Sequence, residues 1–185
     1  MFLATPCYRG APSEPTQRTG DAILARYGGS WGRVEGCPWV GNARSELVAE
    51  FLDTNESHLL FIDADISFPL ATVDRMLASP APVVCVKYPR RLPPHTLVEG
   101  LGCTLVARGV FEALWAAWPQ LTYLRGCNDK PAVHIFAHAV GMLDGSMRIM
   151  GEDQVFYRRV RASSFAIEMI DDPAIIHDGI RNTSR

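Results

Sequence analysis

The run LLFI at residues 59–62 constrains the fold of this chain more than any other feature of its sequence. It contains no polar side chain, although alternate residues of a strand point to opposite faces of a sheet. A strand of this kind must be covered on both faces, as the strands of a parallel sheet are. The run VVCV at residues 83–86 has the same character. The two runs therefore predict a mainly parallel sheet with helices on both faces.

Segments with helical periodicity alternate with these apolar runs. Residues 42–55 carry apolar side chains at helical spacing behind Asn42, a favourable N-cap residue. We also predict helices at 70–77, 108–118 and 152–162, and strands at 1–4, 102–107, 165–170 and 174–176. Strands that alternate with helices predict an α/β fold, here a single domain over residues 1–185.

Three other stretches carry no clear periodicity. Residues 9–19 are rich in the residue types of loops, and residues 119–150 are predicted to be irregular. No helix or strand is predicted in the glycine-rich stretch 28–36. Trp31 lies in that stretch and Trp39 shortly after it, and we interpret both as core residues in preference to a surface that stacks on a base or sugar.

Charge and cysteine content exclude several classes of protein. A formal net charge of -2 and a pI of about 6.2 give no overall basic field for nucleic acid or an anionic membrane. The five cysteines form no C-x-x-C pair, which disfavours a disulfide framework or a zinc ribbon. The opening MFLATPCYRG lacks a signal-peptide pattern, and no apolar run has the roughly 20 residues that span a bilayer. We therefore expect a cytoplasmic protein.

Two aspartates follow the first apolar run directly. Asp63 and Asp65 form an Asp-x-Asp motif at the carboxyl end of the predicted strand, which is where ligands bind in such sheets. Two carboxylates held together repel each other unless a cation lies between them, and Mn²⁺ or Mg²⁺ suits oxygen ligands. The alternative is a solvated loop with two acidic residues.

The sequence resembles the GT-A class of nucleotide-sugar glycosyltransferases. Four segments carry the resemblance in the order that the class has them: the D-x-D at Asp63 and Asp65, EGLGCTLVARGVFEAL, GEDQVFYRRVR and IIHDG. The run NARSELVAEFL also resembles the first helix of the class. The resemblance implies a Rossmann-like GT-A domain and is greatest to small phage and bacterial transferases of the family-two type. It implies transfer of a hexosyl group from a nucleotide-diphosphate sugar, with a UDP-sugar as the first candidate, in a bacterial or phage-infected cell.

The resemblance assigns a donor site. Asp63, Asp65 and His177 would hold the Mn²⁺ or Mg²⁺ ion that binds the diphosphate. The nucleotide sugar would contact a larger set of residues: Thr5, Pro6, Tyr8, Arg44, Asp63, Ala64, Gly100 and Gly102. For Arg44 the alternative is a surface arginine on a helix, and for the two glycines it is an ordinary turn.

The resemblance also assigns the catalytic residues. In inverting members of the class, the Asp of the acidic pair deprotonates the acceptor hydroxyl, which makes Asp153 the base and Glu152 its partner here. The alternative is that both carboxylates only stabilise the N-terminus of their helix. A retaining reaction would give this position another role, so the stereochemistry stays open.

Basic residues suggest one acceptor among several. Phosphates could meet Lys87, Arg90, Arg91, Arg158, Arg159 and Arg161, and the resemblance to phage enzymes suggests a 5-hydroxymethyl pyrimidine of DNA. A solvated face is the alternative for these residues, and polysaccharide, lipid-linked or protein acceptors stay open. A zinc site at His134 and His138 is disfavoured, because the segment does not have the pattern of a helix.

Other functions fit parts of the same pattern. A haloacid-dehalogenase-type phosphatase also has an apolar strand before D-x-D, with Asp63 as nucleophile and Asp65 as general acid. That motif usually lies near the N-terminus, and no downstream lysine motif is found here. Sugar-nucleotide pyrophosphorylases have a glycine-rich N-terminal signature that is missing. A binding module without turnover is the third alternative.

Overall fold

The computed structural model describes residues 1–90, 97–126, 128–143, 146–177 and 180–181. Its central sheet has the strand order β12-β5-β7-β3-β1-β2. The strands are β1 (Phe2–Cys7), β2 (Ser30–Glu35), β3 (His58–Ile62), β5 (Val83–Pro89), β7 (Cys103–Ala107) and β12 (Ile167–Asp171). Only β7 runs antiparallel to its neighbours in this order, so the prediction of a mainly parallel sheet is confirmed.

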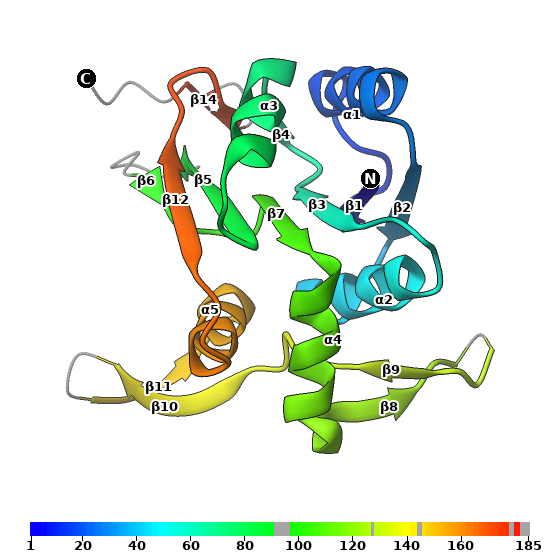
Figure 1. The fold of residues 1–185 in the computed structure, drawn as a ribbon, viewed down its shortest axis with the longest axis vertical. Helices are drawn as coiled ribbons and strands as arrows, with labels where there is room; N and C mark the ends of the chain where they lie inside the picture. Colours follow the sequence, from blue (N-terminus) through cyan, green and yellow to red (C-terminus); the bar gives the residue numbers. More distant parts are fainter. Residues whose placement is uncertain (91–96, 127, 144–145, 178–179, 182–185) are drawn as a thin grey trace.

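Helices cover both faces of the sheet, as predicted (Figure 1). One face carries α1 (Glu14–Tyr27) and α3 (Leu70–Ala78), and the other carries α2 (Val40–Leu52), α4 (Arg108–Ala117) and α5 (Glu152–Ala162). The short helix η1 spans Pro119–Leu121. This is the two-sided α/β layer arrangement.

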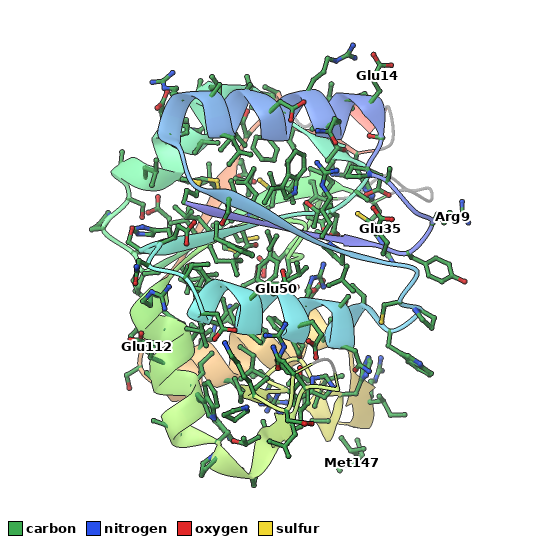
Figure 2. The ribbon with its side chains drawn as sticks, turned by 90° about the vertical axis from the view of Figure 1, so that its right-hand side faces the viewer. Arg9, Glu14, Glu35, Glu50, Glu112 and Met147 are labelled. Atoms are coloured by element: carbon green, nitrogen blue, oxygen red, sulfur yellow. The ribbon has the colours of Figure 1, made fainter. Side chains whose placement is uncertain are left out.

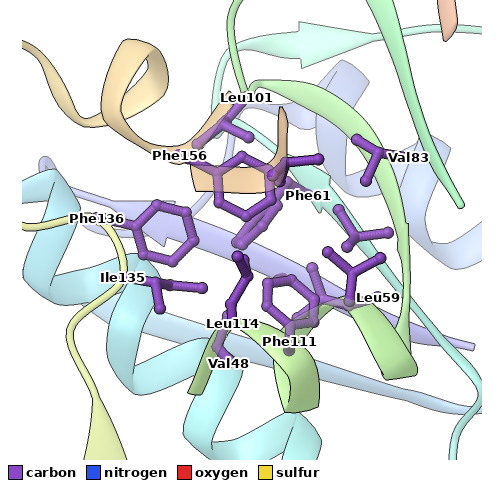
Figure 3. Packing of buried hydrophobic residues seen from close by; sticks show 14 of the residues in the cluster. Val48, Leu59, Phe61, Val83, Leu101, Phe111, Leu114, Ile135, Phe136 and Phe156 are labelled. Carbon is purple, nitrogen blue, oxygen red and sulfur yellow. The ribbon is translucent and has the colours of Figure 1, made fainter. Parts of the chain in front are cut away.

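The side chains of β3 divide between two hydrophobic clusters. Leu59 and Phe61 face the cluster under α2, α4 and α5, while Leu60 and Ile62 face the cluster under α1 and α3. All four are fully buried, which explains why the run contains no polar residue. Figure 3 shows Phe61 among the aromatic rings of the first cluster, where its ring meets that of Phe136 edge to face.

Short strands complete the fold. In chain order they are β4 (Ile66–Ser67), β6 (Leu97–Val98), β8 (Thr122–Leu124), β9 (Pro131–Val133), β10 (Ala139–Leu143), β11 (Ser146–Met150), β13 (Ile176–His177) and β14 (Ile180–Arg181). β6 pairs with β5, and two antiparallel ribbons are formed by β8 with β9 and by β10 with β11. β13 pairs with both β4 and β14. The prediction of an irregular segment at 119–150 was therefore wrong.

Two further elements were missed by the sequence patterns. The helix α1 begins inside the predicted loop 9–19, where the Ser13 hydroxyl accepts a hydrogen bond from the Thr16 amide and Pro15 occupies the first turn. The Ser and Pro residues that suggested a loop are also the residue types that favour the start of a helix. The strand β2 lies in the glycine-rich stretch. Its Gly32 has to be a glycine because an added Cβ would lie 2.5 Å from the Phe2 ring. This glycine permits close packing inside the strand.

The start of α2 also differs from the prediction. The helix begins at Val40, with Trp39 as its N-cap residue, so Asn42 lies in the first turn and is not the cap. Trp39 is 66% exposed, which contradicts its interpretation as a core residue. Trp31 does pack against the cluster under α1 and α3. No helix among the described residues is long and apolar enough to span a membrane.

Candidate active site

The D-x-D motif lies in a tight turn between β3 and β4. The Asp63 amide donates to the Gly102 carbonyl at 3.0 Å, and the Ile66 amide donates to the Asp63 carbonyl at 3.1 Å. The turn borders a pocket of about 290 Å³ whose lining is Pro6, Tyr8, Arg9, Gly10, Ala11, Val40, Asp63, Ala64 and Asp65. This pocket lies beyond the carboxyl ends of β1 and β3, where open α/β sheets bind ligands.

The pairing of β13 with β4 brings His177 to Asp65. His177 lies opposite Ile66 in the register, and its Nε2 is 3.5 Å from Asp65 Oδ2. Its Nδ1 is 2.7 Å from the Pro89 carbonyl oxygen. Because a carbonyl only accepts hydrogen bonds, Nδ1 carries the proton and the lone pair of the neutral ring is on Nε2. A histidine oriented through a backbone carbonyl is typical of metal ligands.

These two side chains fit part of the predicted metal site. A carboxylate oxygen and an imidazole nitrogen suit Mn²⁺, and substrate phosphates commonly supply further ligands. The described residues contain no group of three metal-ligating side chains. Asp63, the third predicted ligand, binds Arg44 through its Oδ1 at 2.8 Å.

Arg44 connects the two acidic motifs of the sequence. Its Nη2 contacts Asp63, and its Nη1 lies 2.8 Å from Asp153 Oδ1 and 3.0 Å from Glu152 Oε1. The guanidinium is only 2% exposed. Burial opposes its charge, but the three carboxylates raise the pKa of Arg44 above its ordinary value and keep it ionised. Arg44 therefore holds the end of β3 and the start of α5 together.

The acidic pair occupies the first turn of α5. Burial raises the pKa of Asp153 to about 6, and the Arg44 guanidinium opposes this increase. The Asp153 side chain nevertheless keeps 29% of its surface exposed, so a ligand can reach it. A carboxylate with a pKa near 6 is ionised at neutral pH and is more basic than an ordinary aspartate, which suits a general base.

Gly100 and Gly102 pack closely against the side chains of the site, including Asp63 and Asp153. A Cβ at Gly102 would lie 2.6 Å from Asp63 Oδ2, and one at Gly100 would lie 2.1 Å from the Tyr88 hydroxyl and 3.2 Å from Asp153 Oδ2. The Gly100 carbonyl accepts hydrogen bonds from Tyr157 and Thr104. The glycines thus make room for the protein's own site residues, whereas the sequence predicted a close approach of backbone to substrate.

We expect Gly102→Ala to lower the free energy of unfolding by roughly 1–3 kcal/mol and to displace Asp63, because the new methyl overlaps its carboxylate and Ile66. Gly109→Ala is the matched control, since nothing lies within 4 Å of a Cβ there and the position is in α4. Urea denaturation of both variants measures the difference. An equal effect at the two positions would contradict the described packing.

The structure separates the predicted donor residues into two groups. Pro6, Tyr8 and Ala64 line the pocket together with the two aspartates. Thr5 does not, because it is fully buried and its hydroxyl accepts a hydrogen bond from Trp31 Nε1. Arg44 is likewise buried beneath the site, so direct contact with a diphosphate and the surface alternative are both inconsistent with its position.

Two of the predicted basic residues are engaged within the protein. Lys87 Nζ lies 3.4 Å from Asp171, and the Arg159 guanidinium donates to the Ile135 carbonyl. Arg91 lies outside the described residues. His134 Nδ1 is paired with the Ser45 hydroxyl at 2.8 Å, and His138 lies 3.9 Å from Glu152, so the structure gives no support to a zinc site there.

Tyr88 is a site residue that the sequence did not indicate. Burial raises the pKa of its hydroxyl, so it stays protonated at neutral pH. Its ring packs edge to face against that of His177. It lies in an apolar strand like any core aromatic residue, and only the packing of Gly100 against its hydroxyl reveals its place beside the carboxylates.

Comparisons with known proteins establish the fold. No protein-family model and no curated protein matches the sequence. A197 from STIV aligns with a TM-score of 0.52 and 14% identity, over 92% of this chain and 81% of that one. The catalytic domain of Drosophila beta1,4galactosyltransferase 7, solved in complex with xylobiose, aligns with a TM-score of 0.52 and 18% identity.

The chain has the GT-A fold. Its match to the Drosophila domain covers 91% of this chain but only 63% of that domain. In the strand order of this Rossmann-like architecture, β7 is the reversed strand. At these identities the likeness concerns the fold, and the chemistry has to be argued from the site.

Proposed function

We propose that this GT-A protein is a metal-dependent glycosyltransferase that moves a hexosyl group from a nucleotide-diphosphate sugar, with a UDP-sugar as the first candidate, to an acceptor hydroxyl. One observation carries the proposal: buried Arg44 links Asp63, beside the D-x-D pocket, to Asp153 at the start of α5. The fold match to a domain named as a galactosyltransferase supports it. The D-x-D pocket and a basic carboxylate are therefore connected through one buried side chain.

On the donor side, Asp65 and His177 are the residues that would hold Mn²⁺ or Mg²⁺. A bound divalent ion would neutralise the charge of the nucleoside-diphosphate leaving group. The imidazole ligand favours Mn²⁺ over Mg²⁺. Pro6, Tyr8 and Ala64 line the space for the nucleotide, and Asp63 is held by Arg44 at the border of that space.

On the acceptor side, Asp153 is the proposed base. The acceptor oxygen forms its bond to the anomeric carbon, the bond from that carbon to the diphosphate oxygen breaks, and the hydroxyl proton passes to the Asp153 carboxylate. Arg44 holds one oxygen of Asp153, and its second contact from Nη1 holds Glu152 in place. Glu152 is thus a positioning partner of the base.

The DNA acceptor and the phosphatase alternative are less well supported by the contacts of the site. A DNA acceptor would be favoured by a continuous basic surface, but Lys87 and Arg159 are engaged within the protein. A phosphatase that uses Asp63 as nucleophile has no support, because the carboxylate is bound by a buried arginine that lowers its nucleophilicity. Hydroxymethylated DNA and an aryl phosphate are therefore only comparison substrates in the assay.

The direct test is a thermal-shift screen of UDP-, GDP- and dTDP-sugars with and without Mn²⁺. A donor at about 100 times its Kd stabilises the protein by roughly 2.7 kcal/mol, which raises Tm by about 5–10 °C in a domain of this size. We expect this shift to need Mn²⁺ and to disappear in Asp65→Ala. The control Asp21→Ala changes an exposed aspartate of α1 that bonds only Gln17 among the described contacts.

Turnover with the stabilising donor then distinguishes the candidate functions. Release of the nucleoside diphosphate, faster with an acceptor present, supports glycosyl transfer. Binding without turnover for any saccharide, lipid-linked or DNA acceptor would support a binding module. An unchanged donor shift in Asp65→Ala would contradict the assigned donor site.

A further inference from the structure

Trp39 is a large aromatic residue that the fold leaves on the surface. It is the N-cap residue of α2 and is 66% exposed. Its carbonyl accepts hydrogen bonds from the Asn42 and Ala43 amides at 3.0 Å, but its side chain makes no capping hydrogen bond. It belongs to neither hydrophobic cluster of the described residues. Exposed tryptophans are enriched where proteins bind partners, so the indole has the character of a binding surface.

The fold places Trp39 at the edge of the sheet that carries the candidate active site. Since β2 runs parallel to β1, both strands end at this edge. Figure 2 shows Glu35, the last residue of β2, on the same side of the molecule as Arg9, which lines the D-x-D pocket. Val40 follows Trp39 directly and lines that pocket as well. The exposed indole therefore belongs to a residue adjacent to the donor pocket.

The first turn of α2 also packs against the acceptor side of the site. A Cβ added at Gly41 would lie 3.6 Å from Glu152 Cβ, and Glu152 directly precedes the proposed base Asp153. The exposed His138 borders the same place, because its Nε2 lies 3.9 Å from Glu152 Oε2. Trp39 is two residues before Gly41 and therefore lies between the donor pocket and the acidic start of α5.

The charges of the site favour an uncharged acceptor. Three carboxylates, those of Asp63, Glu152 and Asp153, surround Arg44, whose guanidinium is only 2% exposed and therefore cannot meet a phosphate. The excess negative charge opposes a phosphate or a uronate on the acceptor. A neutral pyranose has hydroxyl groups that donate to carboxylates and an apolar face of C–H bonds. That face suits the negative π face of an indole.

We propose, on the basis of the proposed function, that the acceptor is a neutral saccharide and that Trp39 is the platform on which its pyranose ring stacks. His138 and Glu152 border the bound sugar, and one of its hydroxyls faces Asp153. The oxygen of that hydroxyl forms the new glycosidic bond, the bond from the anomeric carbon to the diphosphate breaks, and the proton passes to Asp153. The platform thus selects the class of acceptor, and the carboxylates exclude anionic ones.

The test follows the indole N–H signals of isotope-labelled protein by NMR, with and without UDP and Mn²⁺. The probes are the methyl glycosides of glucose, galactose and xylose, with glucuronate and an oligothymidylate as anionic comparisons. The chain has four tryptophans, and the signal lost in Trp39→Phe is that of Trp39. We expect neutral glycosides to shift this signal.

The affinity for the glycoside that gives the largest shift is then measured by saturation-transfer NMR. Trp39→Ala should weaken it roughly 10-fold or more, because the stacked apolar area is lost, whereas Trp39→Phe keeps an aromatic face and should retain most of it. Trp39→Ala removes no side-chain cap from α2, so the variant is expected to fold. The matched control is Leu124→Ala, which changes a residue with the same 66% exposure on the β8–β9 ribbon.

The outcomes separate acceptor binding from donor binding and from turnover. A Trp39 signal that neutral glycosides shift, with an unchanged donor-induced thermal shift in Trp39→Ala, supports the platform whether or not transfer is detected. Where transfer is detected, Trp39→Ala should raise the acceptor KM more than it lowers kcat. The proposal is overturned when no neutral glycoside shifts the signal, when an anionic probe shifts it equally, or when Leu124→Ala weakens binding equally. Loss of the donor shift in Trp39→Ala would assign the indole to the donor and also overturn it.

Discussion

Arg44→Met is expected to lower the free energy of unfolding by about 3–5 kcal/mol, because it leaves three carboxylates crowded around a buried apolar side chain. Asp63 and Asp153 would also lose the side chain that fixes their positions relative to each other. A displacement of about 1 Å in a catalytic group typically costs about 100-fold in rate. We therefore expect a large loss of kcat in whatever fraction stays folded, measured by denaturation and by donor turnover.

Arg125→Met is the matched control for this prediction. Arg125 is also nearly buried and bonds carboxylates, with Glu46 at 2.9 Å and Asp53 at 3.3 Å, but it joins the β8–β9 ribbon to α2 away from the site. It should cost stability without a specific loss of kcat. Arg44→Lys keeps the charge but lacks the planar fork, so stability should recover more than kcat. Equal kcat losses in Arg44→Met and Arg125→Met would contradict the role of Arg44.

Asp153→Asn is expected to lower kcat by roughly 10²- to 10⁴-fold, the usual contribution of a general base. In the wild-type protein, kcat/KM should fall about 10-fold per pH unit below pH 6, because burial raises the pKa of Asp153 to about 6 and the protonated acid accepts no proton. The residual activity of the variant should lack this limb. Asp74→Asn, on the opposite face in α3, is the control and should keep the full profile.

The same pKa predicts a difference in stability with an unambiguous sign. The pKa of Asp153 is raised from 3.8 to about 6 on folding, so the folded state binds this proton more tightly than the unfolded chain. The resulting stabilisation is complete below about pH 4 and is lost as pH rises through 6, by at most about 3 kcal/mol. Asp153→Asn stays neutral, so its stability relative to wild type should rise over that window. A constant difference from pH 4 to 7 would contradict the raised pKa.

The elements that carry the two acidic motifs could be predicted from local patterns. β3 and β5 are apolar on both faces because helices cover both, and α3, α4 and α5 show their periodicity directly. The predictions failed where the same local composition is typical of both a loop and a regular element, as in residues 9–19 and 28–36. Gly32 in β2 packs against the Phe2 ring, Gly29 before the strand packs against Met1, and the polar start of α1 is a helix cap.

The site depended on contacts that no local pattern records. Arg44 meets Asp63 across 19 positions of sequence and Asp153 across 109. The sequence pattern does not distinguish Arg44 from other helical arginines. It therefore predicted only a surface residue or a contact to the donor phosphates. The resemblance placed His177 with Asp65, but the pairing of β13 with β4 that brings them together involves two-residue strands, which are too short to predict from a local pattern.

By itself, the sequence determined the layered α/β architecture and the positions of the D-x-D turn and the acidic helix start, because periodicity and apolar runs are properties of neighbouring residues. The tertiary structure alone decided that these motifs share one buried arginine and that Asp153 is more basic than an ordinary aspartate. Burial and charge pairing arise only when distant segments meet, since both depend on what surrounds a side chain in space.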